Sequence, residues 1–468
     1  MSMLRVSMLI VVTTFGFANV FDNLAEMGLA AIPSWFAVGV LYFVPLALIL
    51  AEFSSDERHA KGGLYSFMAR GLSPTWAFVG TWSYFVANLV YLQSAFSKLP
   101  IRASLALRGE DVFETRTWLL PPIAVAICLA LTWVATRGVR LFSVGADWLG
   151  KATLVLVAAL VTTPLLFFLF GRPSATPITL SGLVPRFDLD YFSTFSWLLF
   201  AVAGAEVAAP YVRDTENPRR NFPRAILFST VLIAAAYTLA SLAVVLLMPV
   251  ETIRKATGIY DVWIPWAEQL GLPAASVAGL AAAVITLGSA AAYIVWLESP
   301  IRAMFADVPA GTFPSRFLRA DDKGTLHFAL WVQAGVVVAL ILVPLLSILA
   351  GMAGSEAFIS LVNDLSSLSL VVPYVFLAIA YIRARRAGMD APFKMTRSNP
   401  LALAIAGVVL VVSSAGYFGA GLFALQTRPI DWLYVAIVYG GPVLLVLLGL
   451  SLRAWSLRVS SARSRAGG

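Results

Sequence analysis

The stretch FAVAGAEVAAPY, residues 200–211, interrupts one of the long apolar runs of this chain. Small residues, one carboxylate and a following proline lie close together there, a combination that disfavours a continuous membrane helix. Pro210 has no backbone N–H, so the carbonyl of Glu206 loses its helical donor. A carboxylate in hydrocarbon is also costly unless it faces a wet cavity or is protonated. We therefore expect a broken helix and a functional role for Glu206, with a purely structural role as the alternative.

A second interruption lies in the first apolar run, which reads TTFGFANVFDN over residues 13–23. Gly16 weakens a helix, and the polar side chains of Asn19, Asp22 and Asn23 compete for nearby backbone groups. Two interpretations stay open. The run is either unwound near mid-span, or it is a continuous helix whose polar side chains face a neighbour.

The composition around these interruptions is that of a membrane protein. Of 468 residues, 60% are hydrophobic and only 12% are charged, whereas a soluble surface needs far more charge. A helix needs about 20 apolar residues to cross a bilayer, and the apolar runs predict about twelve such helices. They lie near 6–30, 34–54, 75–99, 118–136, 142–170, 190–213, 223–249, 273–299, 326–350, 356–383, 399–423 and 430–453.

Lys and Arg are distributed unevenly between the connections. The N-terminus, the even-numbered connections and the C-terminus hold about 23 of the 33 Lys and Arg, and the odd-numbered connections hold about nine. The positive-inside rule then places both termini in the cytoplasm of a multi-pass protein of the cell (plasma or inner) membrane. The net charge of +8 is accordingly a topology signal, and no nucleic-acid partner is expected.

The two interruptions fall in runs one and six. These are equivalent positions in a five-plus-five inverted repeat, with repeat one over about 6–170, repeat two over about 190–383, and two appended helices over about 399–453. The whole forms one transmembrane domain, residues 1–453, followed by a basic tail, residues 454–468. Such folds bind substrate at the midplane between two broken helices. Freed N–H groups suit a carboxylate and opposing carbonyls suit an ammonium, so a zwitterionic amino acid fits.

The sixth run and its connection, FAVAGAEVAAPYVRDTENPRRNFPRAI, resemble the amino acid–polyamine–organocation (APC) superfamily, and most closely its glutamate:GABA antiporter-like branch. Members have small residues ending in Gly-x-Glu, then an Asn-Pro-basic stretch and a proline before run seven. Gly204, Glu206, Asn217, Pro218, Arg219, Arg220 and Pro223 fill these places, and Lys61-Gly62-Gly63, Gly288-Ser289 and Pro373-Tyr374 support them. The resemblance covers about residues 5–450 and implies an all-α, LeuT-type transporter with broken helices 1 and 6.

The resemblance also implies which residues bind substrate. The unwound part of span one and the small residues of span six would face each other across it. Phe200 and Tyr293 occupy the places of aromatic residues that cover the substrate in relatives. Phe200 replaces the tryptophan of arginine exchangers, which argues against arginine or agmatine. The implied substrate-binding residues are Gly16, Phe17, Ala18, Asn19, Phe200, Ala203, Gly204, Ala205 and Tyr293.

Three residues are candidates for proton coupling or gating. Glu206 matches the gate glutamate implicated in proton sensing. Lys151 lies about two residues before the lysine that replaces a sodium ion in proton-coupled relatives, and a structural pair with Asp147 is the alternative. Asp364 either faces the transport path or lies in headgroup water. Glu298, by contrast, is expected to be a solvated charge at a helix end.

These features predict a secondary active transporter that carries a small amino acid or amine by alternating access, as an exchanger or a proton-coupled symporter. The alternatives are a carrier of another small organic amine or cation, or a channel, although no filter-like repeat is present. Two His and the single Cys128 give little material for a metal site or an activated nucleophile. We therefore expect neither an enzyme nor a cofactor, with proton coupling an option, and the sequence sets no oligomeric state.

Overall fold

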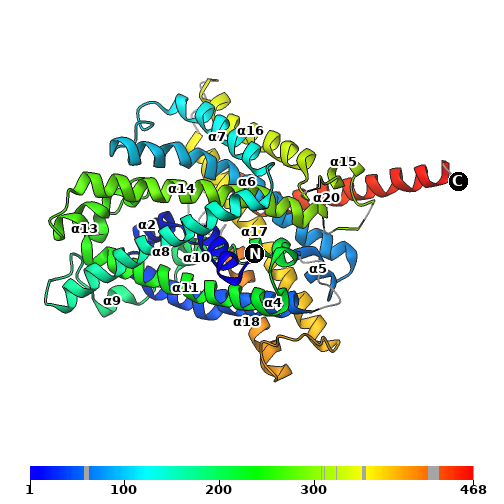
Figure 1. Cartoon of the computed structure of the whole chain (residues 1–468), viewed down its shortest axis with the longest axis horizontal. Helices are drawn as coiled ribbons and strands as arrows, with labels where there is room; N and C mark the ends of the chain where they lie inside the picture. The colour runs from blue at the N-terminus through cyan, green and yellow to red at the C-terminus, as the bar shows by residue number, and fades with distance from the viewer. Residues whose placement is uncertain are drawn as a thin grey trace.

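The computed structural model describes residues 1–56, 63–306, 308–309, 311–322, 324–349, 355–419 and 432–466. Over these ranges the chain is helical and has no strand, which confirms the all-α class. The long helices lie side by side along the long axis of the molecule, and the C-terminal helix projects beyond them (Figure 1).

The first half of the chain begins with a broken helix and ends with the long helix α8. Short helical segments join the membrane-length ones. In order, the elements are α1 (Met3–Thr14), α2 (Phe17–Met27), η1 (Gly28–Ala30), α3 (Ala31–Val38), η2 (Gly39–Phe43), α4 (Val44–Ser55), α5 (Leu64–Ala69), α6 (Pro74–Arg108), η4 (Thr117–Leu119), α7 (Leu120–Ala135) and α8 (Val139–Leu169).

The second half also begins with a broken helix and ends with α18 and α20. Its elements are α9 (Leu180–Leu183), α10 (Leu189–Ala201), η5 (Glu206–Asp214), α11 (Pro218–Leu247), η6 (Val250–Thr252), α12 (Gly258–Asp261), α13 (Trp263–Gln269), α14 (Ala274–Ile301), η7 (Arg302–Ala306), α15 (Ser315–Leu318), α16 (His327–Leu349), α17 (Ser355–Arg386), α18 (Asn399–Gly419) and α20 (Trp432–Ala466).

Each predicted apolar run overlaps a helix or a broken helix, but two boundaries differ. Helix α6 continues through Pro100, past the predicted end at 99, to Arg108. Helix α20 continues to Ala466, so the tail predicted over 454–468 is largely helical. In the described residues, eight helices are long and apolar enough to cross a membrane. The multi-pass character is thus clear, while the number of twelve crossings stays a prediction.

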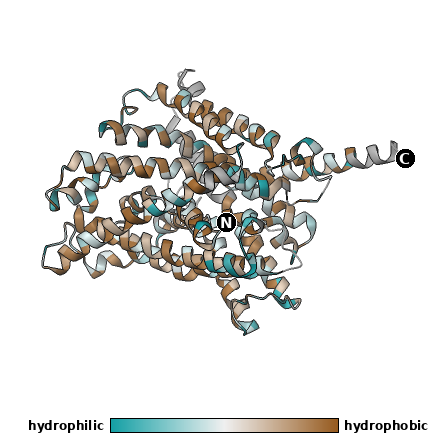
Figure 2. Ribbon diagram, viewed as in Figure 1, coloured by the Kyte–Doolittle hydropathy of each residue, from teal (hydrophilic) through white to brown (hydrophobic). Residues whose placement is uncertain are grey.

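Hydrophobic residues, brown in Figure 2, occur on the outer helices of the bundle as well as on the inner ones. Trp133 on α7, Trp148 and Val155 on α8, and Leu447 on α20 are all more than half exposed. A water-soluble protein would not present so many large apolar side chains outward, whereas lipid tails accept them without cost. These faces are the lipid-contacting surface.

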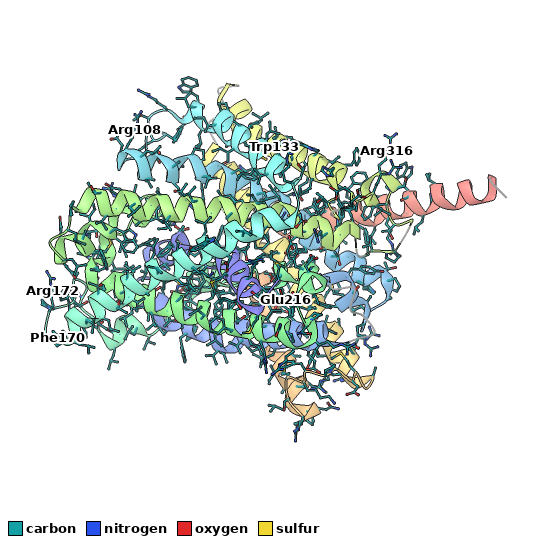
Figure 3. All side chains as sticks on the ribbon, in the orientation of Figure 1. Arg108, Trp133, Phe170, Arg172, Glu216 and Arg316 are labelled. Atoms are coloured by element: carbon teal, nitrogen blue, oxygen red, sulfur yellow. The ribbon has the colours of Figure 1, made fainter. Side chains whose placement is uncertain are left out.

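Successive connections lie at opposite ends of the bundle. Arg108 and Arg172 lie at one end and Arg316 at the other (Figure 3). The segment η1 contacts both η6 and α9, and α5, η5 and η7 contact one another. We call the end with Arg108, Arg172, η1, η6 and α9 the odd end, because it carries odd-numbered connections. The opposite end, with Arg316, α5, η5 and η7, is the even end.

Helix α1 lies inside the bundle and packs against α8, α11 and α14. Its residues from Val6 to Val12 are all buried. Gly150 lets α8 approach closely, because a Cβ there would lie 2.7 Å from the Met8 carbonyl oxygen. The break at the end of α1 is therefore at the centre of the molecule.

Candidate substrate site

The first helix is broken after Thr14. Phe15 and Gly16 have extended backbone, and α2 begins at Phe17. The structure thus selects the unwound interpretation of this run over the continuous one. The break is shorter than the resemblance implied, because Phe17, Ala18 and Asn19 belong to the first turn of α2 instead of the non-helical segment.

The sixth helix is broken between Ala201 and Glu206, as predicted. Gly204 has a φ of +144°, a conformation that residues with a Cβ rarely adopt. A Cβ on Gly204 would lie 2.1 Å from Thr14 Oγ1. Gly204 therefore serves two purposes. It makes the turn possible, and it lets the break between α10 and η5 contact the break after α1.

Tyr237 of α11 holds the two breaks together. The Gly16 N–H and the Asn19 amide each donate a hydrogen bond to its hydroxyl oxygen at 3.0 Å. The hydroxyl donates to the Thr14 carbonyl at 2.7 Å, and the Ala201 carbonyl is a second acceptor at 3.1 Å. One buried side chain thus satisfies backbone groups that both interruptions leave without helical partners. Sequence reasoning missed Tyr237, although a tyrosine inside an apolar run needs a partner for its hydroxyl.

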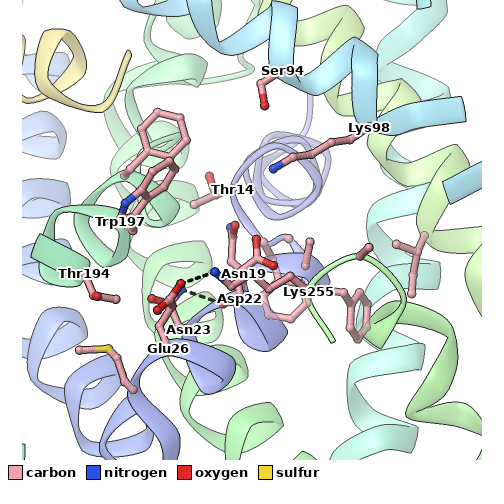
Figure 4. Close-up of a pocket in the computed structure, with 18 of the residues that line it drawn as sticks. Thr14, Asn19, Asp22, Asn23, Glu26, Ser94, Lys98, Thr194, Trp197 and Lys255 are labelled. Atoms are coloured by element: carbon pink, nitrogen blue, oxygen red, sulfur yellow. Dashed lines mark hydrogen bonds and ion pairs between the residues drawn. The ribbon is translucent and has the colours of Figure 1, made fainter. Parts of the chain in front are cut away.

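A cavity of about 1610 Å³ extends from these breaks toward the odd end. Its inner wall is formed by the segment from Val12 to Asn19. The odd-end side of the cavity is lined by residues in or next to odd-numbered connections. They are Glu26, Met27, Gly28, Leu29, Ala30, Ser181, Gly182, Val184, Arg186, Asp188, Lys255 and Ala256. Figure 4 shows Asn19, Asp22 and Asn23 of α2 on one side of this space and Lys98 of α6 on the other.

Most of the predicted substrate-binding residues meet at this cavity. Six of the nine line it: Gly16, Phe17, Ala18, Asn19, Phe200 and Tyr293. Ala203 lines a smaller cavity of about 60 Å³ beside the first, together with Thr14, Asn88 and Tyr91. Gly204 and Ala205 line neither space and instead pack behind the break.

Glu206 is buried, with 1% of its surface exposed, and lies behind the break on the side of the even end. Its Oε2 accepts a hydrogen bond from the Gly204 N–H at 3.0 Å, and its Oε1 accepts one from the Tyr374 hydroxyl at 2.8 Å. Glu206 does not line the cavity. It links the turn of the sixth helix to α17.

The other two coupling candidates are placed differently. Lys151 forms an ion pair with Asp147 at 2.8 Å, and 42% of its side chain is exposed. It does not line the cavity, although Thr153 of the same helix does. The side chain of Asp364 is not among those that the structure describes. Lys61 and Gly62 lie outside the described residues. Coupling roles for Lys151 and Asp364 stay predictions.

Two cationic residues that sequence reasoning did not assign to the site also line the cavity. Lys98 lies near the end of the run predicted over 75–99 and Arg102 lies beyond that end, but α6 carries both as helical residues. Arg102 donates hydrogen bonds to Ser289 Oγ at 2.7 Å and to the Tyr293 hydroxyl at 3.1 Å. The available signal was their spacing from Tyr91, which places all three on one helix face.

The even end is closed by buried ionic contacts. Glu298 accepts hydrogen bonds from Tyr211 and Arg302, and Arg302 reaches Asp214 at 3.4 Å. Only 1% of Glu298 is exposed, so the expectation of a solvated helix-end charge was wrong. The reason is that η5 folds back across the end of α14 and covers it, with Ser299 Oγ donating to the Val207 carbonyl at 2.8 Å.

A second buried cluster at the even end joins α4 to α17. Arg385 and Glu52 form an ion pair at 3.1 Å, with side chains 4% and 0% exposed. Glu52 Oε2 also accepts hydrogen bonds from the Tyr381 hydroxyl at 2.6 Å and from the Met395 N–H at 2.9 Å. In the described residues, no group of three or more His, Cys, Asp or Glu is arranged to hold a metal ion.

Comparisons with known proteins agree with this architecture. The amino acid permease family matches residues 1–442. The "Inner membrane transporter YjeM" of Escherichia coli (strain K12) is 29% identical over 97% of this chain and 95% of its own length. The "Aspartate/glutamate permease AcaP" of Lactococcus lactis subsp. cremoris (strain MG1363) is 26% identical over 94% of this chain and 91% of its own. A "Glutamate/gamma-aminobutyrate antiporter" of the same strain is 23% identical over 64% of this chain and 60% of its own length.

A solved structure shows the same fold. The crystal structure of MhsT in complex with L-phenylalanine superposes with a TM-score of 0.59 and covers 89% of this chain and 98% of its own. At 14% identity this likeness establishes the fold alone, and that fold is the LeuT type with broken first and sixth helices. The family match over residues 1–442 establishes the family of the chain. The chain belongs to the amino acid permease family of the APC superfamily and is a secondary amino acid transporter.

Proposed function

We propose that the chain binds a small amino acid at the paired breaks of the first and sixth helices and carries it across the membrane by alternating access. The observation that carries this proposal is the asymmetry of the bundle. A cavity of about 1610 Å³ leads from the breaks to the odd end, while the even end is closed by buried ionic contacts. A binding site open to one side only is what an alternating-access carrier requires.

The breaks offer the groups that a zwitterion needs. The N–H groups of Phe17 and Ala18 lie in the first turn of α2, where a helix provides no acceptor of its own, and they suit a carboxylate. Thr14 Oγ1 and Asn88 Oδ1 are buried oxygens with no hydrogen-bond partner in the described residues. Both residues line the cavity of about 60 Å³ next to Phe200, and both oxygens can accept hydrogen bonds from an ammonium group.

The positive-inside rule orients this asymmetry. The even-numbered connections carry most of the Lys and Arg, so the even end faces the cytoplasm and the cavity opens outward. Both termini are then cytoplasmic, in the plasma or inner membrane. Opening the even end requires η5 to separate from α14 and α17.

Glu206 is the proposed gate and proton-sensing residue. As a carboxylate it accepts both the Gly204 and the Tyr374 hydrogen bonds. After protonation on Oε1, the carboxyl group donates to the Tyr374 hydroxyl instead of accepting from it, and both contacts become weaker hydrogen bonds between neutral groups. Protonation therefore loosens the hold of α17 on the turn. Phe200 and Tyr293, whose rings both pack on Tyr91, would close over the bound substrate.

Counterflow in proteoliposomes tests this function. The purified chain is reconstituted, the vesicles are loaded with a labelled amino acid, and unlabelled amino acid is added outside. We expect the external substrate to accelerate the loss of label by at least tenfold over protein-free vesicles. Loss of label that no external amino acid accelerates would refute the exchanger, and single-channel currents under these conditions would establish a channel instead.

A further inference from the structure

We infer that Lys98 and Arg102 form a subsite for a second carboxylate on the substrate, so that the chain selects amino acids with an acidic side chain. The inference rests on the proposed function, because it takes the paired breaks as the site for the amino acid's own ammonium and carboxylate groups. It adds the residues that recognise the far end of the substrate.

The geometry of α6 places these cations beside the substrate. Tyr91, Lys98 and Arg102 follow one another at intervals of seven and four residues, so they share one face of the helix. All three line the cavity. Tyr91 packs on Phe200 with ring centroids 5.5 Å apart, which fixes its level at the break in the sixth helix.

Lys98 lies farther along the same wall. Seven residues of helix separate it from Tyr91, a rise of about 10 Å. Side chains on a helix lean toward its N-terminus, which for α6 is toward the breaks. The four-carbon stem of Lys98 thus carries its ammonium back toward the substrate, and Figure 4 shows it pointing from α6 into the space beside Asn19 and Asp22.

The two cations have no carboxylate bound to them. In the described residues, Lys98 makes no hydrogen bond and no ion pair within 4 Å. Arg102 donates only to the hydroxyls of Ser289 and Tyr293, which are neutral. The contrast is with Lys255 at the cavity mouth, whose ammonium is already paired with Glu26. Lys98 and Arg102 therefore keep donors that a ligand can use.

The charge balance of this wall favours an anion. Asp22 is the carboxylate whose charge acts on Lys98, and Arg102 and Lys255 are the cations that do so. Deep in the cavity, two cations thus face one carboxylate. An unpaired charge within a membrane protein is costly, and such charges mark substrate or ion pathways. A bound carboxylate would neutralise the excess, whereas a cationic side chain would be repelled and a neutral one would leave the charge uncompensated.

The test compares glutamate with glutamine, which has the same shape and no charge at its far end. Counterflow is measured with the reconstituted full chain for both amino acids and for a cationic amino acid, lysine. We expect apparent affinity for glutamate or aspartate at least tenfold above that for glutamine and asparagine, with no lysine transport. Replacing Lys98→Met should remove this preference by lowering glutamate affinity tenfold or more, without lowering that for glutamine.

Two matched variants complete the experiment. Lys98→Arg keeps the charge and should keep the preference for glutamate. Lys255→Met removes a cation that is already paired, and it should leave the preference within threefold of the unmodified chain.

The outcomes separate the inference from the function on which it rests. A chain that exchanges neutral or cationic amino acids as well as glutamate would overturn the acidic subsite but leave the transporter intact. The same holds if Lys98→Met weakens glutamate and glutamine equally, since that is the signature of a structural lysine. Absence of counterflow for any amino acid would overturn both proposals.

Discussion

The two ends of the bundle differ in how their polar and charged side chains are paired. At the odd end, polar and charged side chains such as Asp22 and Lys98 line an open cavity and make few contacts with one another. At the even end, Glu298 and Glu52 are buried within ion pairs and tyrosine hydroxyl contacts. The open end has charged side chains without an ion-pair partner in the described residues, such as Lys98, and the closed end has charged side chains that pair with one another.

This difference indicates which contacts must form and which must break during a transport cycle. Closing the odd end requires a ligand that satisfies the groups left open there. Opening the even end requires breaking buried pairs, each of which is costly to separate when one partner stays buried. Substrate binding at the paired breaks can connect the two events, because the breaks touch the cavity on one side and, through Gly204 and Glu206, the closed end on the other.

The largest expected effect is at the contact between the two breaks. Gly204→Ala adds a Cβ 2.1 Å from Thr14 Oγ1 and imposes a φ of +144° on a residue that rarely adopts it. Strain and overpacking together cost as much as about 6 kcal/mol. We expect loss of counterflow, measured as above. Gly335→Ala is the control, because a Cβ at Gly335 meets open space; equal activity of the two variants would show that the breaks do not need close contact.

The next largest effect concerns the closed end. Arg385→Met removes one member of a buried ion pair and leaves Glu52 without its cation, which costs about 3–5 kcal/mol. We expect a marked fall in the thermal unfolding temperature in detergent. Lys394→Met removes a cation from an exposed pair with Asp390 and should cost less than about 1 kcal/mol. Similar shifts for both variants would mean that the buried cluster does not hold the even end.

A smaller effect is expected at Glu206. Glutamine keeps one acceptor oxygen and loses the other, so Glu206→Gln resembles the protonated residue, at a cost of about 1.5–3 kcal/mol for a charged hydrogen bond. Because protonation weakens the hydrogen bonds that hold the turn to α17, exchange by the unmodified chain should accelerate as pH falls. The variant should exchange at a constant rate, equal to the low-pH rate of the unmodified chain. An unchanged pH profile in Glu206→Gln would remove the proton-sensing role.

The sequence predicted the breaks well because they depend on local chemistry. Gly16, Gly204 and Pro210 interrupt apolar runs in ways that any neighbouring structure must accommodate. The shorter break in the first helix was less predictable, since Phe17 and Asn19 start a helix only where Tyr237 takes up the freed groups. That partner lies more than two hundred residues away along the chain.

Sequence reasoning missed the cations Lys98 and Arg102 in the cavity and the closure of the even end for a related reason. The third span was predicted to end at 99, yet α6 continues through Pro100 and keeps Lys98 and Arg102 on the cavity face. Glu298 looked like an exposed end charge, because nothing local shows that η5 folds over it. Both features depend on packing between distant segments, which the pattern of one sequence does not contain.

The central claim is that the two ends open in turn, and cysteine accessibility tests it most directly. Cys128 is buried and is the only cysteine, so Cys128→Ala gives a background free of thiols. Thr194→Cys then reports on the cavity, and Ala209→Cys on the buried even end. A maleimide should label Thr194→Cys and spare Ala209→Cys without substrate, and saturating amino acid should lower the first rate and raise the second. Rates that stay unchanged or fall together would contradict the account.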